Sequence, residues 1–213
     1  MFEAVIFDFD GTVADTGLGV KNAIRYALNE YKMPIYEDRL DEFLGPPLYL
    51  TFENMYNISK ELASDIVDTY RVYYSKKGVY EVEAYPGMLD LLADLKKAGV
   101  KLAVASSKPK HYLDVGIPYI GVDKYFDAVV GPDLKNTEPN KTQLVLKACD
   151  MLGVTPSKNI AMIGDRSFDM VGANTAGVTS VGILFGFGKE EELKENNADK
   201  IAKDIKELRD ILL

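Results

Sequence analysis

Short apolar runs rich in strand-forming residues alternate along the chain with stretches of helical periodicity. Runs of this kind predict strands that are buried on both faces of a sheet. Five such runs occur, at Ala4–Phe7, Lys101–Ala105, Asp127–Val130, Ile160–Ile163 and Val178–Leu184. Because strands that alternate with helices are typical of an α/β fold, we expect a parallel sheet covered by helices on both faces.

The helical stretches carry apolar residues at the spacing of one helix face. Met88, Leu91, Leu92 and Leu95 follow the i, i+3, i+4, i+7 pattern, and Gly99 is placed to end that helix. Two more stripes of the same period consist of Leu144, Ala148, Met151 and Leu152, and of Ile201, Ile205, Leu208 and Leu212. Together with the strands, these helices predict a Rossmann-like parallel sheet core.

One connection is far longer than the others. The chain spends about 90 residues between the first strand and the second, although a parallel crossover needs only about a dozen. Two helical stripes lie inside this connection, formed by Ile24, Ala27, Leu28 and Tyr31, and by Leu62, Ile66, Tyr70 and Tyr73. We therefore expect residues 17–83 to form an inserted helical domain, and residues 1–16 and 84–213 to form the sheet core.

The composition narrows the class of protein. The 213 residues carry a net charge of −8, which argues against a nucleic-acid partner. The single cysteine, Cys149, excludes an intrachain disulfide, and the single histidine, His111, makes a zinc site unfavourable. No basic segment precedes the first apolar run, and the uncharged stretch Met170–Gly188 holds five glycines. We expect no membrane span and a cytoplasmic location.

Polar residues suited to chemistry follow four of the predicted strands. They are Asp8 and Asp10 after the first strand, Ser106 after the second, Lys141 beyond the third, and Asp165 and Asp169 after the fourth. Ligands of open α/β sheets bind beyond the carboxyl ends of the strands, so we expect these side chains to converge. Carboxylate oxygens suit Mg²⁺ completed by water and a substrate phosphate, while a serine and a lysine would bind the phosphoryl oxygens.

Each of these features also has a purely structural interpretation. Asp10 begins a common turn pair, and Asp165 after a strand can simply cap the next helix. Ser106 can cap a helix that begins at Pro109, and Lys141 alone is typical of a surface lysine near a helix start. The four features occur together and in one order after the expected strands, which favours a phosphate-binding metal site.

The same residues resemble the motifs of the haloacid dehalogenase superfamily of phosphatases, and the likeness covers the whole chain. The segments that carry it are Asp8–Thr16 (D-x-D-G-T-[LV]-x-D-[ST]), Val104–Ser106, Lys141 and Gly164–Asp169 (G-D-x-x-x-D). The insertion is similar to the C1-type helical cap of this family, and Gly45–Leu48 resembles the cap loop of phosphoglycolate-phosphatase-like members. The third motif departs from the commoner K-P-x-P, so Lys135 is the alternative to Lys141.

The resemblance implies a role for each residue. Asp8 would be the nucleophile that forms an aspartyl phosphate, and Asp10 would be the general acid and base. Ser106 and Lys141 would bind the transferring phosphoryl group. Mg²⁺ would be held by Asp8, the Asp10 carbonyl, Asp165 and Asp169. The residues expected to contact substrate are Thr12, Ser107, Lys108, Gly45 and Pro46.

The expected function is therefore Mg²⁺-dependent hydrolysis of a small phosphorylated metabolite, as in phosphoglycolate phosphatases or nucleotidases. A sugar-phosphate mutase of the β-phosphoglucomutase type shares nearly every residue named here and is the main alternative. A dehalogenase of the same superfamily does not need an acid at the position of Asp10, so the presence of Asp10 argues against that activity. A receiver module switched by aspartyl phosphate has its acidic pair and its phosphorylated aspartate on separate strands and lacks the insertion.

Overall fold

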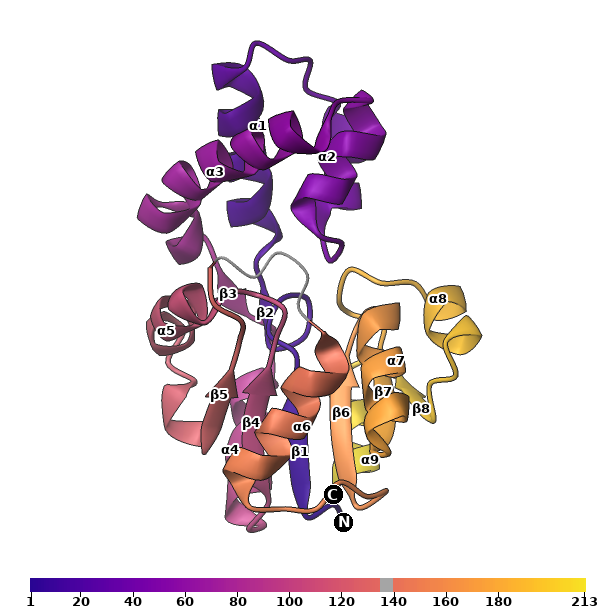
Figure 1. The fold of residues 1–213 in the computed structure, drawn as a ribbon. Coiled ribbons are helices and arrows are strands. Elements are labelled where there is room, and N and C mark those ends of the chain that lie inside the picture. The colour runs from indigo at the N-terminus through magenta and orange to yellow at the C-terminus, as the bar shows by residue number, and fades with distance from the viewer. Residues whose placement is uncertain (135–139) are drawn as a thin grey trace. The chain divides into compact units, whose positions relative to one another are not determined.

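The computed structural model describes residues 1–134 and 140–213, which form two compact units (Figure 1). The first unit comprises Met1–Asp15 and Ala84–Leu213, and the second comprises Thr16–Glu83. The first boundary thus falls between residues 15 and 16, one residue earlier than the sequence boundary of the expected insertion. Among the described residues, no helix has both the length and the apolar character needed to cross a bilayer.

The first unit is built on a six-stranded sheet with the strand order β5-β4-β1-β6-β7-β8. The strands are β1 (Ala4–Phe7), β4 (Lys101–Ala105), β5 (Ala128–Val130), β6 (Ile160–Gly164), β7 (Thr179–Ile183) and β8 (Lys200–Ala202). Every neighbouring pair is parallel, so the predicted α/β class is confirmed. Phe7 lies opposite Val104 of β4 and Ile163 of β6, so residues that follow these three strands meet at one edge.

Helices cover both faces of this sheet. They are α4 (Met88–Lys97), α5 (Lys110–Tyr119), η3 (Asp123–Tyr125), α6 (Lys141–Leu152), α7 (Ser167–Ala176), α8 (Glu190–Glu195) and α9 (Ile205–Leu212). In Figure 1, α6 and α7 lie in front of the sheet, and α4 and α9 lie behind it. Side chains alternate between the faces of a strand, so Ala4 and Ile6 join the core under α6 and α7. Val5 and Phe7 point the other way and are equally buried.

The C-terminal segment differs from the sequence expectation. Ile201, expected to open the last helical stripe, lies instead in the short strand β8, where it pairs with Gly182 of β7. Helix α9 begins only at Ile205, and the Asp204 side chain caps it by accepting the Glu207 N–H at 2.8 Å. A three-residue edge strand is too short to show a period of two, which explains why the sequence pattern missed it.

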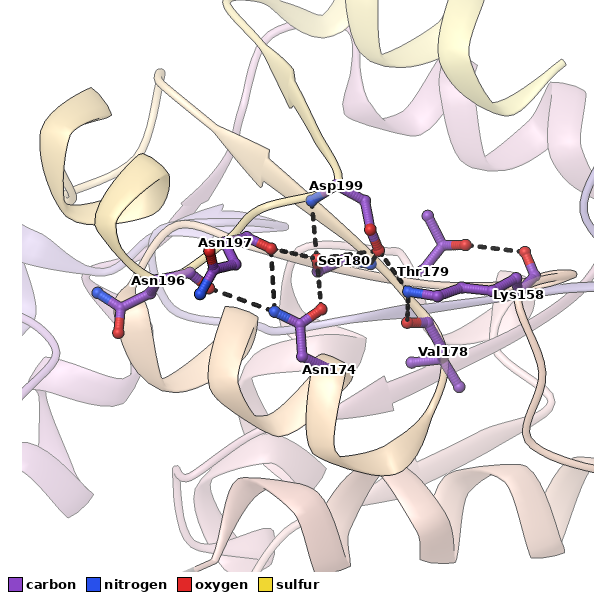
Figure 2. A network of polar contacts seen from close by, with 8 residues as sticks. All are labelled: Lys158, Asn174, Val178, Thr179, Ser180, Asn196, Asn197 and Asp199. Carbon is purple, nitrogen blue, oxygen red and sulfur yellow. Dashed lines mark hydrogen bonds and ion pairs between the residues drawn. The ribbon is translucent and has the colours of Figure 1, made fainter.

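A network of hydrogen bonds and an ion pair connects the segment before β8 with β7 and α7 (Figure 2). The Asp199 carboxylate, just before β8, accepts the Ser180 N–H at 2.9 Å and the Lys158 ammonium at 2.6 Å. In return, the Asp199 N–H donates to the Ser180 hydroxyl at 2.9 Å, and that hydroxyl donates to the Asn174 side chain at 3.0 Å. Ser180 is fully buried at the centre of this network, which joins β7, α7 and the segment before the edge strand.

The second unit consists of helices. They are α1 (Gly17–Glu30), η1 (Glu37–Phe43), α2 (Leu48–Tyr56), α3 (Lys60–Lys76) and η2 (Gly78–Tyr80). Helices α1 and α3 pack against each other and bury Ile24, Leu28 and Ile66. The chain enters and leaves this unit through two-residue strands, β2 (Ala14–Asp15) and β3 (Glu83–Ala84), which pair in a sheet of their own. The sequence analysis expected no strand here, because two residues carry no readable pattern.

Candidate active site

The loop after β1 places the first carboxylate. Strand β1 ends at Phe7, so it does not run on through Asp8 and Asp10, and strand alternation does not set their directions. The Phe9 carbonyl accepts hydrogen bonds from the N–H groups of residues 12, 13 and 14, which folds the chain back tightly. Gly11 supplies the positive φ of +74° in this turn. The Asp8 side chain is 13% exposed, and its Oδ1 accepts the Phe9 N–H at 2.7 Å.

Three carboxylates meet at the ends of β1 and β6, which are neighbours in the sheet. Oxygens of Asp8, Asp165 and Asp169 all lie within 4.8 Å of one another. Asp165 directly follows β6 and is fully buried, and Asp169 stands in the first turn of α7. The Asp169 Oδ2 accepts the Arg166 N–H at 3.1 Å, which holds the turn between the two carboxylates closed. The structure thus brings together three of the carboxylates that the strand order singled out.

Lys141, the first residue of α6, brings positive charge to this cluster. Its Nζ lies 2.7 Å from Asp169 Oδ1 and 3.2 Å from Asp8 Oδ2, and it donates to the Ala105 carbonyl at 3.1 Å. The side chain is 6% exposed, so the interpretation of Lys141 as a surface lysine is wrong. The alternative, Lys135, lies outside the residues that the structure describes.

Ser106 follows β4, the other neighbour of β1. Its hydroxyl is buried, and its polar interaction with Asp8 lowers the pKa of that carboxyl. The same hydroxyl oxygen accepts the Lys108 N–H at 3.3 Å. Helix α5 begins at Lys110 rather than at Pro109, and the Ser106 side chain does not cap it. The interpretation of Ser106 as the cap of this helix is therefore wrong.

Three carboxylates buried beside one ammonium shift the protonation of the cluster. Burial raises the pKa of Asp165 to about 8, and the charges of Asp169 and Asp8 act in the same direction. Burial also raises the pKa of Asp8 to about 6, a shift that the Lys141 charge opposes. Burial disfavours the Lys141 ammonium, but the charges of Asp169 and Asp8 outweigh this effect and raise its pKa. The cluster is short of positive charge, which a divalent cation would supply.

The chemistry of the donors fits Mg²⁺. The cluster offers hard carboxylate oxygens, and proteins bind Mg²⁺ through one or two carboxylates plus water and substrate phosphate. The single histidine and the single cysteine, which would favour a softer metal, lie elsewhere: His111 is exposed on α5, and Cys149 of α6 is buried in the core. The residues present therefore suit the cation that the sequence analysis expected.

The Asp10 carboxylate is held by Lys108 and does not belong to the cluster of three. The Lys108 Nζ lies 2.8 Å from Asp10 Oδ1 and 3.1 Å from Oδ2. The Lys108 side chain is 7% exposed and that of Asp10 is 27% exposed, so the pair is shielded but reachable from solvent. The sequence analysis assigned Lys108 to the substrate, whereas in the structure its ammonium contacts a candidate catalytic carboxylate.

The other residues expected to contact substrate lie in different environments. Thr12 is fully buried and its hydroxyl donates to Asp165 Oδ1 at 3.3 Å, and its contact with substrate stays a prediction. Ser107 is half-buried directly after Ser106. Gly45 and Pro46 belong to the second unit, between η1 and α2, and their contact with substrate stays a prediction.

A backbone contact to the cluster also escaped the sequence analysis. The backbone N–H of Phe187, in the loop after β7, donates to Asp165 Oδ2 at 2.8 Å. Every residue except proline carries this donor, so the residue type gives no signal for it. The flanking residues Gly186 and Gly188 are the only indication in the sequence, because glycines often mark a close approach of backbone.

Fold and site together define a class of protein. A parallel sheet whose central strand ends at a buried carboxylate, with a lysine, a hydroxyl and further carboxylates at the same edge, is suited to phosphoryl transfer. The chain belongs to the haloacid dehalogenase-like hydrolase family, whose model matches residues 5–183. It is a phosphatase of that family, as its relatives indicate.

Three relatives illustrate the range of the family. A 5'-nucleotidase from Pseudomonas aeruginosa is 33% identical over 98% of this chain and 94% of its own length. The crystal structure of a predicted phosphatase from Clostridium acetobutylicum superimposes with a TM-score of 0.92 at 34% identity and covers 100% of this chain and 98% of that one. The tyrosine-protein kinase PtkA of Mycobacterium tuberculosis is 32% identical over 99% of this chain and 72% of its own length.

Proposed function

We propose that this phosphatase hydrolyses small phosphomonoesters in an Mg²⁺-dependent reaction through an aspartyl phosphate on Asp8. The observation that carries the proposal is the position of the Asp8 carboxylate, which lies within reach of Lys141 and Ser106 and shares a cluster with Asp165 and Asp169. A nucleophile, donors for a phosphoryl group and ligands for a cation thus occur at one sheet edge.

In the first step, an Asp8 carboxylate oxygen attacks phosphorus in line with the ester bond. A P–O bond to Asp8 forms as the P–O bond to the leaving group breaks. The protonated Asp10 carboxyl donates its proton to the leaving oxygen, so an alcohol departs rather than an alkoxide. Lys108, which contacts both Asp10 oxygens, holds this carboxyl in place.

In the second step, a water molecule attacks the phosphorus of the aspartyl phosphate. Asp10, now a carboxylate, accepts the proton of this water as its oxygen bonds to phosphorus. The bond between phosphorus and Asp8 breaks, which releases inorganic phosphate and restores the Asp8 carboxylate. Lys141 and Ser106, both in contact with Asp8, donate hydrogen bonds to the phosphoryl oxygens in both steps.

Asp8, Asp165 and Asp169 are the side chains that would hold Mg²⁺, which when bound offsets negative charge on the phosphoryl group. Burial contributes to this role, because carboxylates with little water around them interact more strongly with a cation. The ion-pair contact between Lys141 and Asp169 keeps one of these ligands anchored to α6.

The second unit is proposed to act as a cap that selects substrates by size. It is joined to the first unit through β2 and β3, two short segments that can serve as a hinge. The 5'-nucleotidase relative makes nucleoside monophosphates one class to test, next to phosphoglycolate and sugar phosphates.

A phosphate-release screen over small phosphomonoesters tests the proposal, with MgCl₂ and with EDTA. Activity should vanish with EDTA and return with Mg²⁺. Asp8→Asn should abolish turnover because an amide is a poor nucleophile, whereas Asp114→Asn, an exposed carboxylate on α5, should behave like the wild type. Turnover by Asp8→Asn above a few per cent of wild type, or restoration by Zn²⁺ alone, contradicts the proposal.

Two control reactions separate the alternatives. Conversion of one glucose phosphate isomer into another without phosphate release would identify a mutase. Transfer of phosphate from ATP to a tyrosine peptide would match the name of the mycobacterial relative instead of a phosphomonoesterase.

A further inference from the structure

The segment that joins β7 to α8 packs its backbone directly against the metal-ligand loop. The Phe187 N–H donates to Asp165 Oδ2 at 2.8 Å. A Cβ on Gly186 would lie 2.2 Å from the Gly11 carbonyl oxygen, and a Cβ on Gly188 would lie 1.7 Å from the Asp165 carbonyl oxygen. Side chains at these two positions are therefore excluded, and the glycines permit the amide between them to reach a buried carboxylate.

Helix α8, which follows this loop, contacts the same region with a side chain. The Glu192 Oε1 accepts the Ser167 N–H at 2.7 Å and the Arg166 Nε–H at 3.1 Å. Ser167 is the first residue of α7, where backbone N–H groups lack partners within the helix, and a carboxylate is favourable there. The Glu192 side chain is 24% exposed, and its hydrogen bonds to Ser167 and Arg166 lower its pKa against the effect of burial.

These contacts hold the turn that carries two carboxylates of the cluster. Arg166 and Ser167 stand between Asp165 and Asp169, and the Arg166 N–H itself donates to Asp169 Oδ2 at 3.1 Å. Glu192 therefore fixes the two residues whose backbone sets the separation of Asp165 from Asp169. The Phe187 amide holds the Asp165 carboxylate itself.

We propose that Glu192 is a positioning residue for metal binding, which acts with the Phe187 amide to hold Asp165 and Asp169 at the separation that Mg²⁺ requires. This inference rests on the proposed function, since it concerns the same cation. Groups that orient the direct ligands of a metal typically contribute about 10–100-fold to its affinity. Glu192 lies in α8, whereas the proposed ligands lie after β1, after β6 and in α7. The residues that shape the metal site therefore extend beyond the four motifs named in the sequence analysis.

The competing interpretation is that Glu192 only caps α7 and thereby stabilises the fold. Loss of such a cap in a Glu192 variant would lower the melting temperature of the metal-free protein but leave the affinity for Mg²⁺ unchanged. Metal affinity therefore separates the two interpretations, and it can be measured without any substrate.

The experiment measures Mg²⁺ dissociation constants by calorimetry for the wild type, Glu192→Gln, Glu192→Ala and Glu191→Ala. Glu191 is the exposed neighbour in α8 and matches the change in charge. Affinity should fall about 10-fold for Glu192→Ala and less for Glu192→Gln, whose amide oxygen can still accept the Ser167 N–H. Glu191→Ala should bind like the wild type, and saturating Mg²⁺ should restore the turnover of both Glu192 variants.

Unchanged Mg²⁺ affinity in both Glu192 variants, with a wild type that binds Mg²⁺, would overturn this inference and leave the proposed function standing. Equal losses in Glu191→Ala and Glu192→Ala would also overturn it, because they would show a general effect of charge. A wild type that binds no Mg²⁺ would overturn the proposed metal dependence and the inference together. If Glu192→Ala does not fold, the affinity of Glu192→Gln decides.

Discussion

At the residue scale, the contact of Lys108 with Asp10 shows how a neighbouring side chain can orient a proposed catalytic group. A carboxylate that transfers protons is effective only when its oxygens are held toward the bond that changes. Lys108 contacts both oxygens of Asp10 and is itself nearly buried, so its position is well defined. The contact spans a sequence separation of 98 residues, which no local pattern reveals.

A double-mutant cycle measures whether the effect of Lys108 on kcat depends on Asp10. Asp10→Asn should lower kcat by about 10²–10⁴-fold, as expected when a general acid and base is lost. Lys108→Met should lower kcat about 10-fold in the wild-type background but have little further effect in Asp10→Asn, because residues that act as a unit are not additive. Lys110→Met, an exposed lysine paired with Asp114, is the control. Multiplicative losses would show that Lys108 acts independently of Asp10.

The buried cluster predicts how stability depends on pH. The pKa values of Asp8 (about 6) and Asp165 (about 8) stand above the ordinary value of 3.8, so the folded chain holds protons that the unfolded chain releases. The free energy of unfolding of the metal-free protein should therefore fall as the pH rises from about 4 to about 8.

Mg²⁺ compensates the same negative charge, so the rise in melting temperature on adding MgCl₂ should be larger at about pH 8 than at about pH 5. Scanning calorimetry with EDTA or MgCl₂ measures this difference. In the Asp165→Asn variant, the difference between the Mg²⁺-induced rises in melting temperature at the two pH values should be smaller. An equal effect of Mg²⁺ at both pH values would count against the cluster as its binding site.

The convergence of Asp8, Asp165 and Lys141 could be expected from sequence because each follows a recognisable strand, and strand ends share one edge. Thr12 was assigned to the substrate, since residue type alone does not reveal that its hydroxyl is buried on Asp165. The Phe187 amide could not be anticipated, because backbone donors carry no sequence signature.

At the scale of elements, the strands were predictable where apolar residues form runs. The predicted run Val178–Leu184 contains β7 (Thr179–Ile183), and Asp127–Val130 contains β5 (Ala128–Val130). Strands β2, β3 and β8 have two or three residues and depend on pairing partners that are distant in sequence. Such strands are defined by hydrogen bonds to neighbours rather than by their own side chains.

The hydrogen-bond network around Ser180 should contribute measurably to the free energy of unfolding. Ser180→Ala removes a buried hydroxyl that accepts the Asp199 N–H and donates to Asn174, so two polar groups lose a partner. We expect a loss of about 1–3 kcal/mol in the free energy of unfolding. Urea denaturation measures the loss, and Ser75→Ala, an exposed serine of α3, should change it by less than about 0.5 kcal/mol. Equal effects of the two variants would show that the network is dispensable.

At the scale of the whole molecule, the proposed cap predicts a limit on substrate size. If the second unit closes over the site, compact metabolites and a small aryl phosphate should be hydrolysed, whereas a folded phosphoprotein should release negligible phosphate. Parallel assays of kcat/KM on both kinds of substrate measure the difference. A phosphoprotein with a kcat/KM matching the best metabolite would refute the cap and leave the chemistry of Asp8 untouched.

The pairing of β2 with β3 also has a consequence for the order of folding. Strands β1 and β4 are adjacent in the sheet, with Ala4 opposite Lys101, yet the whole second unit lies between them in the chain. Once β2 and β3 have paired, the effective loop between β1 and β4 shrinks to about a quarter of its length, which lowers the entropic cost of closing it by about 1 kcal/mol. Early collapse of the helical insertion would thus hasten the pairing of the central strands, so the rate at which the sheet assembles is coupled to a unit that contributes no strand to it.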